Sequence, residues 1–424
     1  MSINSMRLKS IVGGSAGNLV EWYDFYTYSV LTIYFAPSFF PKADATAQLL
    51  SAAAIFAVGF LMRPVGAWIM GVYADRHGRK AGLALSVALM GGGSLIIALC
   101  PTYARAGVAA PVLLVVARMM QGLSVGGEYG ASATYLSEMA TRDRRGFWSS
   151  FQYVTLVGGQ LSALAVLLVL QGMLTEVQLE SWGWRIPFLI GSVLAIAVYV
   201  LRRGLAETAA FEAQSVDRPR SSFANLWHHH RREFLIVAGI TAGGSAAFYA
   251  YTTYLQKFLV NTSGFSKQTA TEIMTAALIV FMLLQPVWGL IADRFGRKPQ
   301  LLLFGIGGMV VSVPVFTALG TATSPIAAFG LTLIPLTLLG AYTSISALVK
   351  AELFPPHIRT LGVALPYAIG NAAFGGTAEY VALWFKSVST ESGFYWYITA
   401  LIGVATVAIA MLPETKRSSL IVED

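Results

Sequence analysis

The sequence predicts an all-α membrane protein of twelve transmembrane helices, arranged as two related six-helix bundles. Three observations lead to this prediction: an apolar composition, twelve long apolar runs, and a motif that recurs once in each half. Of the 424 residues, 56% are hydrophobic and 12% are charged, whereas a soluble domain carries about 25% charged residues. The net charge of +8 points to a membrane surface rather than to nucleic acid, because the basic residues lie between apolar runs.

The apolar runs have the length that a helix needs to cross a hydrocarbon core, about 20 residues. No cleavage site precedes the first run, so we expect it to be retained rather than removed as a signal peptide. The predicted spans are 12–37, 48–72, 81–101, 109–137, 146–171, 184–203, 234–259, 268–292, 299–320, 324–350, 362–385 and 393–412.

The orientation follows from the basic residues of the loops. Twenty Lys and Arg residues lie on the side of the N-terminus, and four lie on the opposite side, namely Lys42, Arg105, Lys267 and Lys386. Because positive loops stay in the cytoplasm, we expect both termini to be cytoplasmic.

An internal repeat divides the chain. The segment GVYADRHGRK (71–80) recurs as GLIADRFGRK (289–298), and the seven-residue spacing of Glu138 and Arg145 recurs in Glu352 and Arg359. We therefore predict an N-terminal bundle over 1–203, a cytoplasmic linker over 204–233 and a C-terminal bundle over 234–424. Transporters built from such repeats bind their substrates near the midplane between the halves.

The repeated loop also suggests a gate. Its glycines allow two helix ends to approach, and its aspartate can accept charge-assisted hydrogen bonds. We expect these loops to latch the cytoplasmic side, although a purely topological role for the basic residues is the alternative. The predicted gating residues are Asp75, Arg79, Glu138, Arg142, Asp293 and Arg297.

This pair of loops resembles the signature of the major facilitator superfamily. The segments NLVEWYDFY (18–26), FLMRP (60–64) and RMMQGLSVGGEYG (118–130) resemble the metabolite:proton symporter family within it. The resemblance implies the major facilitator fold and the import of a dicarboxylate such as α-ketoglutarate with protons across a bacterial inner membrane. Small organic anions, protons and lipid are then the partners of a monomeric carrier, without cofactor or nucleic acid.

Charged side chains inside the spans are candidate functional groups, since each costs about 2.5–3.5 kcal/mol near a helix centre. Glu21 and Asp24 are three residues apart and share one helix face with Asn18 and Tyr28. Two neighbouring carboxyl groups in a low dielectric disfavour double ionisation, so one of them can hold a proton. We predict proton coupling by Glu21, Asp24 or Glu128; pairing of a carboxylate with an arginine is the alternative.

Arg63 and Arg118 are the candidate substrate-binding cations, because arginine grips a carboxylate with two donors and a dicarboxylate needs two such cations. An internal ion pair that fixes helix packing is the other possibility. Arg118 shares a polar stripe of its helix with Gln121 and Tyr129, and Glu128 lies at the edge of that stripe. We add Tyr28, Gln121 and Tyr129 to the predicted substrate site.

The second half has fewer intramembrane charges. We include Tyr254, Lys257 and Asn371 in the predicted substrate site, although Lys257 can also snorkel to the interface. Glu379 is a possible gate partner for Lys257. We expect Lys350, near the cytoplasmic end of its span, to snorkel, and the glycines around Asn371 to allow bending.

Other function classes fit less well. The run WHHHRR (227–232) abuts a span on the basic side and lacks the ligand spacing of a zinc site, so we predict no metal. No nucleophile, base and orienting group converge as in an enzyme. The remaining alternatives are a symporter for citrate, shikimate or a zwitterionic solute such as betaine or proline, and a sensor that does not transport.

Overall fold

The computed structural model describes the backbone of residues 3–41, 44–77, 79–126, 142–203, 223–356 and 358–421. Within these ranges, the side chains of 3–18, 71–72, 74–83, 142 and 201–203 lie outside the description. Every secondary-structure element of the described residues is a helix. Eight of its helices are long and apolar enough to cross a membrane, and two shorter apolar helices accompany them at Ala84–Leu99 and Ala109–Val125.

Twelve helical segments correspond to the twelve predicted spans. In the first half of the chain they are α1 (Ile3–Phe39), α2 (Ala45–His77), α3 (Arg79–Leu99), α5 (Ala109–Val125), α7 (Arg145–Met173) and α9 (Ile186–Arg203). In the second half they are α11 (Phe223–Tyr249) continued by η3 (Ala250–Tyr254) and α12 (Leu255–Asn261), α13 (Lys267–Phe295), α14 (Arg297–Gly320), α15 (Pro325–Glu352), α16 (Arg359–Gly370) continued by η4 (Asn371–Gly375) and α17 (Ala378–Ser387), and α18 (Ser392–Ala410).

Short elements connect these helices: α4 (Tyr103–Ala106), η1 (Arg142–Arg144), α8 (Glu176–Ser181), η2 (Gly183–Arg185) and α19 (Thr415–Ser418). Most predicted spans lie within the long helices, which extend beyond some of them by up to a few turns. The predicted ends at 101, 184, 324 and 412 fall one or two residues outside α3, α9, α15 and α18. The fourth span, predicted over 109–137, is described to Val125, and the remainder of it lies outside the described residues.

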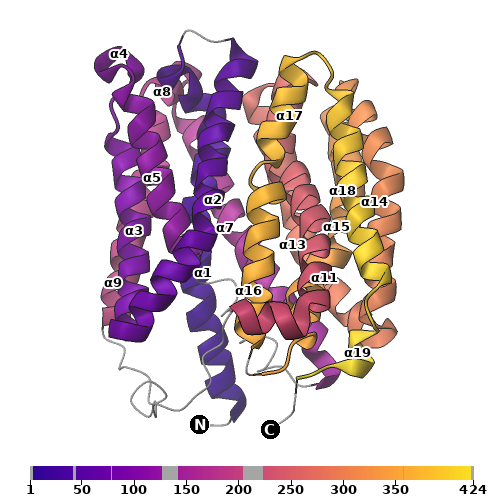
Figure 1. Cartoon of the computed structure of the whole chain (residues 1–424). Helices are drawn as coiled ribbons and strands as arrows, with labels where there is room; N and C mark the ends of the chain where they lie inside the picture. Colours follow the sequence, from indigo (N-terminus) through magenta and orange to yellow (C-terminus); the bar gives the residue numbers. More distant parts are fainter. Residues whose placement is uncertain are drawn as a thin grey trace.

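The helices form two groups that lie side by side, α1–α9 in the indigo to magenta colours and α11–α18 in the red to yellow colours (Figure 1). Both chain ends lie at the same end of the molecule (Figure 1). We refer to it as the terminal end and to the opposite one as the distal end. The groups meet where α7 packs along α13 and where α2 packs along α17 and η4.

The boundary between the groups falls in the polar stretch that the repeat predicts. Residues 204–222 lie outside the description, but 223–233, which we assigned to the linker, form the first turns of α11. The backbone leaves helical geometry at His230 (φ −131°, ψ 28°), so the polar turns and the apolar span meet at a kink. The division into two domains itself remains a prediction.

Large apolar side chains cover the outside of the bundles. Trp68, Val193, Ile326 and Val407 are 71%, 64%, 83% and 64% exposed, respectively. Such a surface is suited to lipid, where helices satisfy all of their own backbone hydrogen bonds. Polar side chains are instead collected inside, and this distribution directs the search for a site to the interior.

Glycines bring α2 and α5 into backbone contact. A Cβ atom on Gly122 would lie 2.0 Å from the carbonyl oxygen of Gly59, and one on Gly126 would lie 2.1 Å from that of Arg63. Small residues allow this approach in lipid, where no hydrophobic force joins the helices. The contact holds Arg63 on α2 close to Arg118 on α5.

Candidate functional site

A buried polar network, the Asp24 cluster, joins α1, α3 and α5. It consists of Asp24, Ser94, Arg118 and Gln121. The Ser94 hydroxyl donates to Asp24 Oδ1, and Gln121 Nε2 donates to Ser94 Oγ at 2.9 Å and to Asp24 Oδ2 at 3.4 Å. Arg118 Nη1 donates to Gln121 Oε1 at 2.6 Å and to the Phe25 carbonyl oxygen at 3.4 Å. The amide of Gln121 therefore links the carboxyl group to the guanidinium group without direct ion pairing.

The Asp24 cluster includes three predicted site residues and adds one that the prediction missed. Asp24 is 1% exposed. Ser94 follows three glycines on α3, and nothing in that pattern marked it as functional. Gly191 on α9 leaves room for the carboxyl group, because a Cβ atom there would lie 2.2 Å from Asp24 Oδ1. Glu21 is buried on α1, but it is not among the hydrogen-bonding or electrostatic partners of Asp24.

Arg63 and Arg118 both stack on Phe25. The guanidinium carbon of each lies 4.4 Å from the centroid of that ring, and Arg63 lies 3.9 Å from the ring of Phe60. Tyr28, a predicted site residue, supplies a further face to Arg118 at 4.7 Å and donates its hydroxyl to the carbonyl oxygen of Ala52. Aromatic faces stabilise a desolvated cation, which explains how two arginines are held in the bundle interior.

Both guanidinium groups retain donors that no described protein group accepts. Nε and Nη2 of Arg63, and the same atoms of Arg118, are buried without a hydrogen-bond partner among the described residues. A buried donor without a hydrogen bond costs about 1–3 kcal/mol, and more when it is charged. Such donors are suited to an incoming carboxylate.

A second group of polar residues lies where the two helix groups meet. This interface cluster consists of Tyr26, Arg63, Tyr249, Lys350 and Tyr367. Tyr26 has Tyr249, Arg63 and Tyr367 as electrostatic neighbours, and the Tyr26 and Tyr249 ring centroids are 6.5 Å apart. Phe60 of α2 contacts the Tyr249 ring at 4.9 Å. Residues from α1 and α2 thus meet residues from α11, α15 and α16 in one place.

Lys350 does not snorkel, contrary to our expectation. It is 1% exposed, and its Nζ lies 4.5 Å from the Tyr367 ring centroid and 5.9 Å from that of Tyr342. The reason is the direction of helical side chains, which lean toward the helix N-terminus. At the end of α15 this direction leads back into the bundle.

A buried ion pair of the second helix group hydrogen-bonds to Ser29 of α1 toward the distal end, and we call these three residues the distal latch. Lys257 Nζ of α12 lies 2.9 Å from Glu379 Oε2 of α17 and 2.5 Å from Ser29 Oγ of α1. Ser29 in turn donates to Glu379 at 3.3 Å. The expected pairing of Lys257 with Glu379 is confirmed, and the snorkelling alternative is wrong because Lys257 is fully buried. Ser29 was missed, since serines are common on transmembrane helices.

The other predicted substrate residues are distributed more widely. The Tyr254 hydroxyl donates to Glu391 at 3.4 Å and its ring packs on Phe394, so it belongs to the distal end of the second group. Asn371 begins the π-helical turn η4, where bending was expected, and its amide atoms are buried without a partner among the described residues. Predictions for Glu128, Tyr129, Asp75, Arg79, Glu138 and Arg142 concern side chains outside the description.

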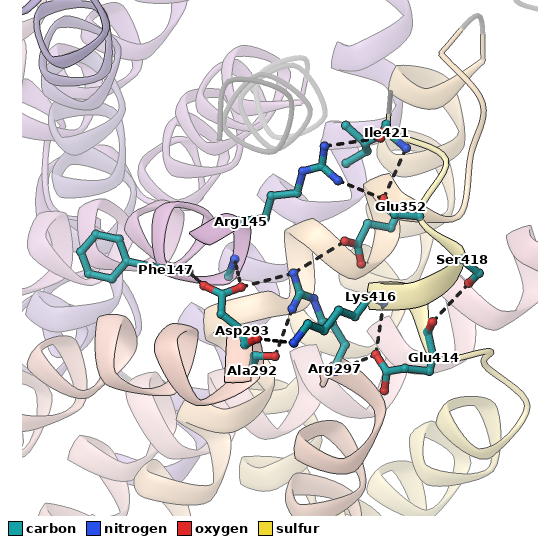
Figure 2. Close-up of polar contacts among 12 residues, drawn as sticks. Arg145, Phe147, Ala292, Asp293, Arg297, Glu352, Glu414, Lys416, Ser418 and Ile421 are labelled. Carbon is teal, nitrogen blue, oxygen red and sulfur yellow. Dashed lines mark hydrogen bonds and ion pairs between the residues drawn. The ribbon is translucent and has the colours of Figure 1, made fainter. Parts of the chain in front are cut away.

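A third connection, the terminal link, lies at the terminal end (Figure 2). Asp293 at the end of α13 accepts the backbone N–H groups of Gly146 and Phe147, the first turn of α7, at 2.8 and 2.9 Å. Arg297 lies 3.3 Å from Asp293 Oδ1 and 3.8 Å from Glu352 Oε1. Both residues were predicted to gate; in the structure Asp293 connects the two helix groups, and Arg297 pairs with acids of the second group.

The profile described as the Major Facilitator Superfamily matches residues 19–378 and 246–420. The chain belongs to the major facilitator superfamily. Over 406 residues it is 52% identical to the alpha-ketoglutarate permease of Escherichia coli K12, covering 96% of this chain and 94% of that protein.

Other relatives in the superfamily are named for substrates other than α-ketoglutarate. The chain is 31% identical to the proline/betaine transporter of Salmonella typhimurium LT2 and to the citrate-proton symporter of Klebsiella pneumoniae, covering 96% and 94% of this chain and 84% and 90% of those proteins. Among solved structures, a D-xylose-proton symporter matches with a TM-score of 0.76 at 19% identity over 97% of this chain and 99% of the other. The Escherichia coli fucose:proton symporter matches with a TM-score of 0.62 at 15% identity over 95% and 98%. These structures support the superfamily fold, and the chain is a membrane transporter.

Proposed function

We propose that this superfamily member imports α-ketoglutarate, or a similar dicarboxylate, together with protons by alternating access. The permease relative at 52% identity supports the substrate class, and the symporter relatives support the coupling ion. We place the terminal end in the cytoplasm of a bacterial cell, on the basis of the loop charges, and treat the carrier as a monomer of two six-helix bundles.

The observation that carries the proposal is the state of Arg63. Its side chain is 4% exposed, stands where the two helix groups meet, and keeps two donors without a described acceptor. No described carboxylate accepts from them. A carboxylate from the substrate satisfies them instead, and a guanidinium group matches a carboxylate in geometry and charge.

Proton coupling belongs to Asp24 in this proposal. The described partners of its carboxyl group are the neutral side chains of Ser94 and Gln121. A carboxyl group with neutral partners can take up and release a proton without breaking an ion pair. Arg118 is joined to it through Gln121, so a change in the charge of Asp24 reaches the cationic end of the network.

The substrate charge constrains the number of protons. A dicarboxylate carries about two negative charges at neutral pH, and a negative interior opposes entry by about 2.3 kcal/mol per charge per 100 mV. Two protons make the transport electroneutral, and three allow the membrane potential to assist. We therefore expect at least two coupled protons, whereas a zwitterion such as betaine needs only one.

The test is uptake by purified carrier in sealed proteoliposomes under an acid-outside pH jump. We expect labelled α-ketoglutarate to accumulate, and citrate, shikimate and betaine at equal concentration to compete weakly. Preferred uptake of one of those three would replace the substrate assignment by that of a relative. Absence of uptake of all four, with binding retained, would favour a sensor.

A further inference from the structure

We propose that Asn371 binds the keto oxygen of the substrate and thereby distinguishes α-ketoglutarate from dicarboxylates that lack this oxygen. The inference deepens the proposed function and rests on it. In that function Arg63 of the first helix group holds a carboxylate of the substrate. Asn371, the first residue of η4 in the second group, supplies a neutral hydrogen-bond donor from the other side of the junction.

The unsatisfied amide of Asn371 is the first argument. The residue is 1% exposed, and neither Nδ2 nor Oδ1 has a hydrogen-bond partner among the described residues. A buried polar group without a hydrogen bond is costly, and nearly all such groups in folded proteins have a partner. An oxygen atom of a bound ligand gives the Nδ2 group the acceptor that the described chain does not provide.

The π-helical turn does not require this amide. The carbonyl oxygen of Asn371 accepts the backbone N–H of Gly376 at 2.8 Å, so the backbone closes the turn itself. At the other π-helical turn, η3, an amide is committed to the backbone, because Gln160 donates to the carbonyl oxygen of Thr252. The Asn371 amide makes no such bond within the described part of the chain. A role in ligand binding fits this difference, since π-helical turns are frequent at functional sites.

The position of Asn371 beside the junction is the second argument. A Cβ atom on Gly375 would lie 2.5 Å from Asn371 Oδ1 and 3.0 Å from Cδ2 of Tyr249, so the amide and this ring border the same glycine. The centroid of the Tyr249 ring lies 4.9 Å from that of Phe60, and the guanidinium carbon of Arg63 lies 3.9 Å from the Phe60 centroid. Two contacting aromatic rings thus connect the surroundings of the amide with those of the guanidinium group.

The chemistry of the amide selects a keto oxygen rather than a carboxylate. A carboxylate away from water requires a cation, because burying an unpaired charge is far more costly than burying a neutral polar group. The Asn371 amide is uncharged, and its N–H donors suit a neutral carbonyl oxygen. In α-ketoglutarate the keto carbon is bonded directly to a carboxylate carbon, so Arg63 and Asn371 would contact adjacent groups of one molecule.

The test compares α-ketoglutarate with glutarate, which has the same carbon chain and both carboxylates but no keto oxygen. Calorimetry measures the binding of each to purified carrier. The wild type should bind α-ketoglutarate about tenfold more tightly, the effect of one neutral hydrogen bond in a buried site. Asn371→Leu should bind the two diacids equally. Its Tm should not fall, because the leucine replaces an amide that has no described partner.

Controls separate this loss from damage to the fold and from loss of the anion site. Gln300→Leu removes another buried amide of the second group, one that donates to the Ala341 carbonyl oxygen at 2.8 Å, and it should retain the tenfold preference. Arg63→Gln should weaken the binding of both diacids alike, because both carry the carboxylates. If Asn371→Leu does not fold, Asn371→Ala should show the same equal binding.

Two results would overturn the assignment and leave the proposed function intact. One is a tenfold preference that persists in a folded Asn371 variant, and the other is a wild type that binds both diacids equally. A wild type that binds neither diacid would instead reject the proposed function itself.

Discussion

Asp24 is a single carboxyl group whose described hydrogen-bond partners are Ser94 and Gln121. Asp24→Asn keeps the size of the side chain and its hydrogen-bonding capacity, but it removes the exchangeable proton. We expect the variant to exchange internal for external α-ketoglutarate at a rate close to that of the wild type, and to lose accumulation driven by a pH gradient. Counterflow and uphill uptake in the same proteoliposomes measure the two activities.

The matched control for this prediction is Glu272→Gln, a carboxyl group on the exposed side of α13. It should retain both activities. Equal loss of exchange and of accumulation in Asp24→Asn would show that Asp24 supports binding or folding rather than coupling.

Part of the candidate site could be predicted from the sequence, residue by residue. The cost of a charge in lipid was sufficient to select Arg63, Arg118 and Asp24. Helical periodicity placed Gln121 beside Arg118, as found. It did not reveal Ser94 or Ser29, because their roles depend on which helix lies opposite, and that information is tertiary. The position of Lys350 near the helix end predicts snorkelling, but the direction of a helical side chain leads this lysine inward.

At the scale of the helices, two π-helical turns mark the approach to the distal latch. Lys257 follows η3 by three residues, and Glu379 follows η4 by four. A π-helical turn frees backbone groups from the regular pattern, and Gln160 of α7 donates to the freed carbonyl oxygen of Thr252 at 2.7 Å. Both helices therefore lose regularity directly before the residues that join the groups. Glycines and polar residues in these segments suggested bending at Asn371, but not the pairing of two such turns.

The distal latch permits a double-mutant test. Lys257→Met or Glu379→Met alone leaves an unpaired buried charge and should destabilise the carrier by about 3–5 kcal/mol, whereas the double variant removes both charges and should cost less than either single change. Thermal unfolding of the purified proteins measures the order. Additive effects of the two substitutions would contradict a coupled pair.

The contact of α2 with α5 gives a second prediction at this scale. Gly122→Ala places a methyl group 2.0 Å from the Gly59 carbonyl oxygen, so the helices must separate. We expect a fall in Tm of about 5 °C or more, together with loss of α-ketoglutarate binding as Arg63 moves away from Arg118. Gly172→Ala, on α7 with no atom within 4 Å of the new methyl group, is the control and should not lower Tm. Unchanged Tm in Gly122→Ala would mean that α2 and α5 can separate without cost.

For the whole molecule, the described contacts join the two helix groups at both ends. The distal latch joins the groups at one end through the hydrogen bonds of Ser29 with Lys257 and Glu379, and the terminal link joins them at the other through Asp293 and the first turn of α7. Alternating access requires that these two connections open in turn, since a carrier open at both ends would dissipate the gradient. The repeat in the sequence predicts that Asp293 and Arg297 act as a gate. It could not show that Asp293 binds the N-terminus of α7, because every residue except proline has a backbone N–H group and the sequence does not indicate which of them are bound.

Asp293 therefore allows the balance between the two ends to be tested. A carboxylate at a helix N-terminus gains from both the backbone N–H groups and the helix dipole, by up to about 2 kcal/mol in partly buried positions. Asp293→Asn keeps one acceptor and removes the charge, so the terminal link should open more often, by about tenfold at a cost of about 1.4 kcal/mol. Ser149→Cys on the adjacent buried face of α7, in a Cys100→Ala background, reports this opening through its rate of alkylation. The rate should rise in Asp293→Asn and remain unchanged in Asp143→Asn, which alters an exposed acid beside the same helix. Equal alkylation rates in all three proteins would mean that the terminal link does not hold that end closed, and the gate would then have to be sought among the N-terminal copy of the repeated loop.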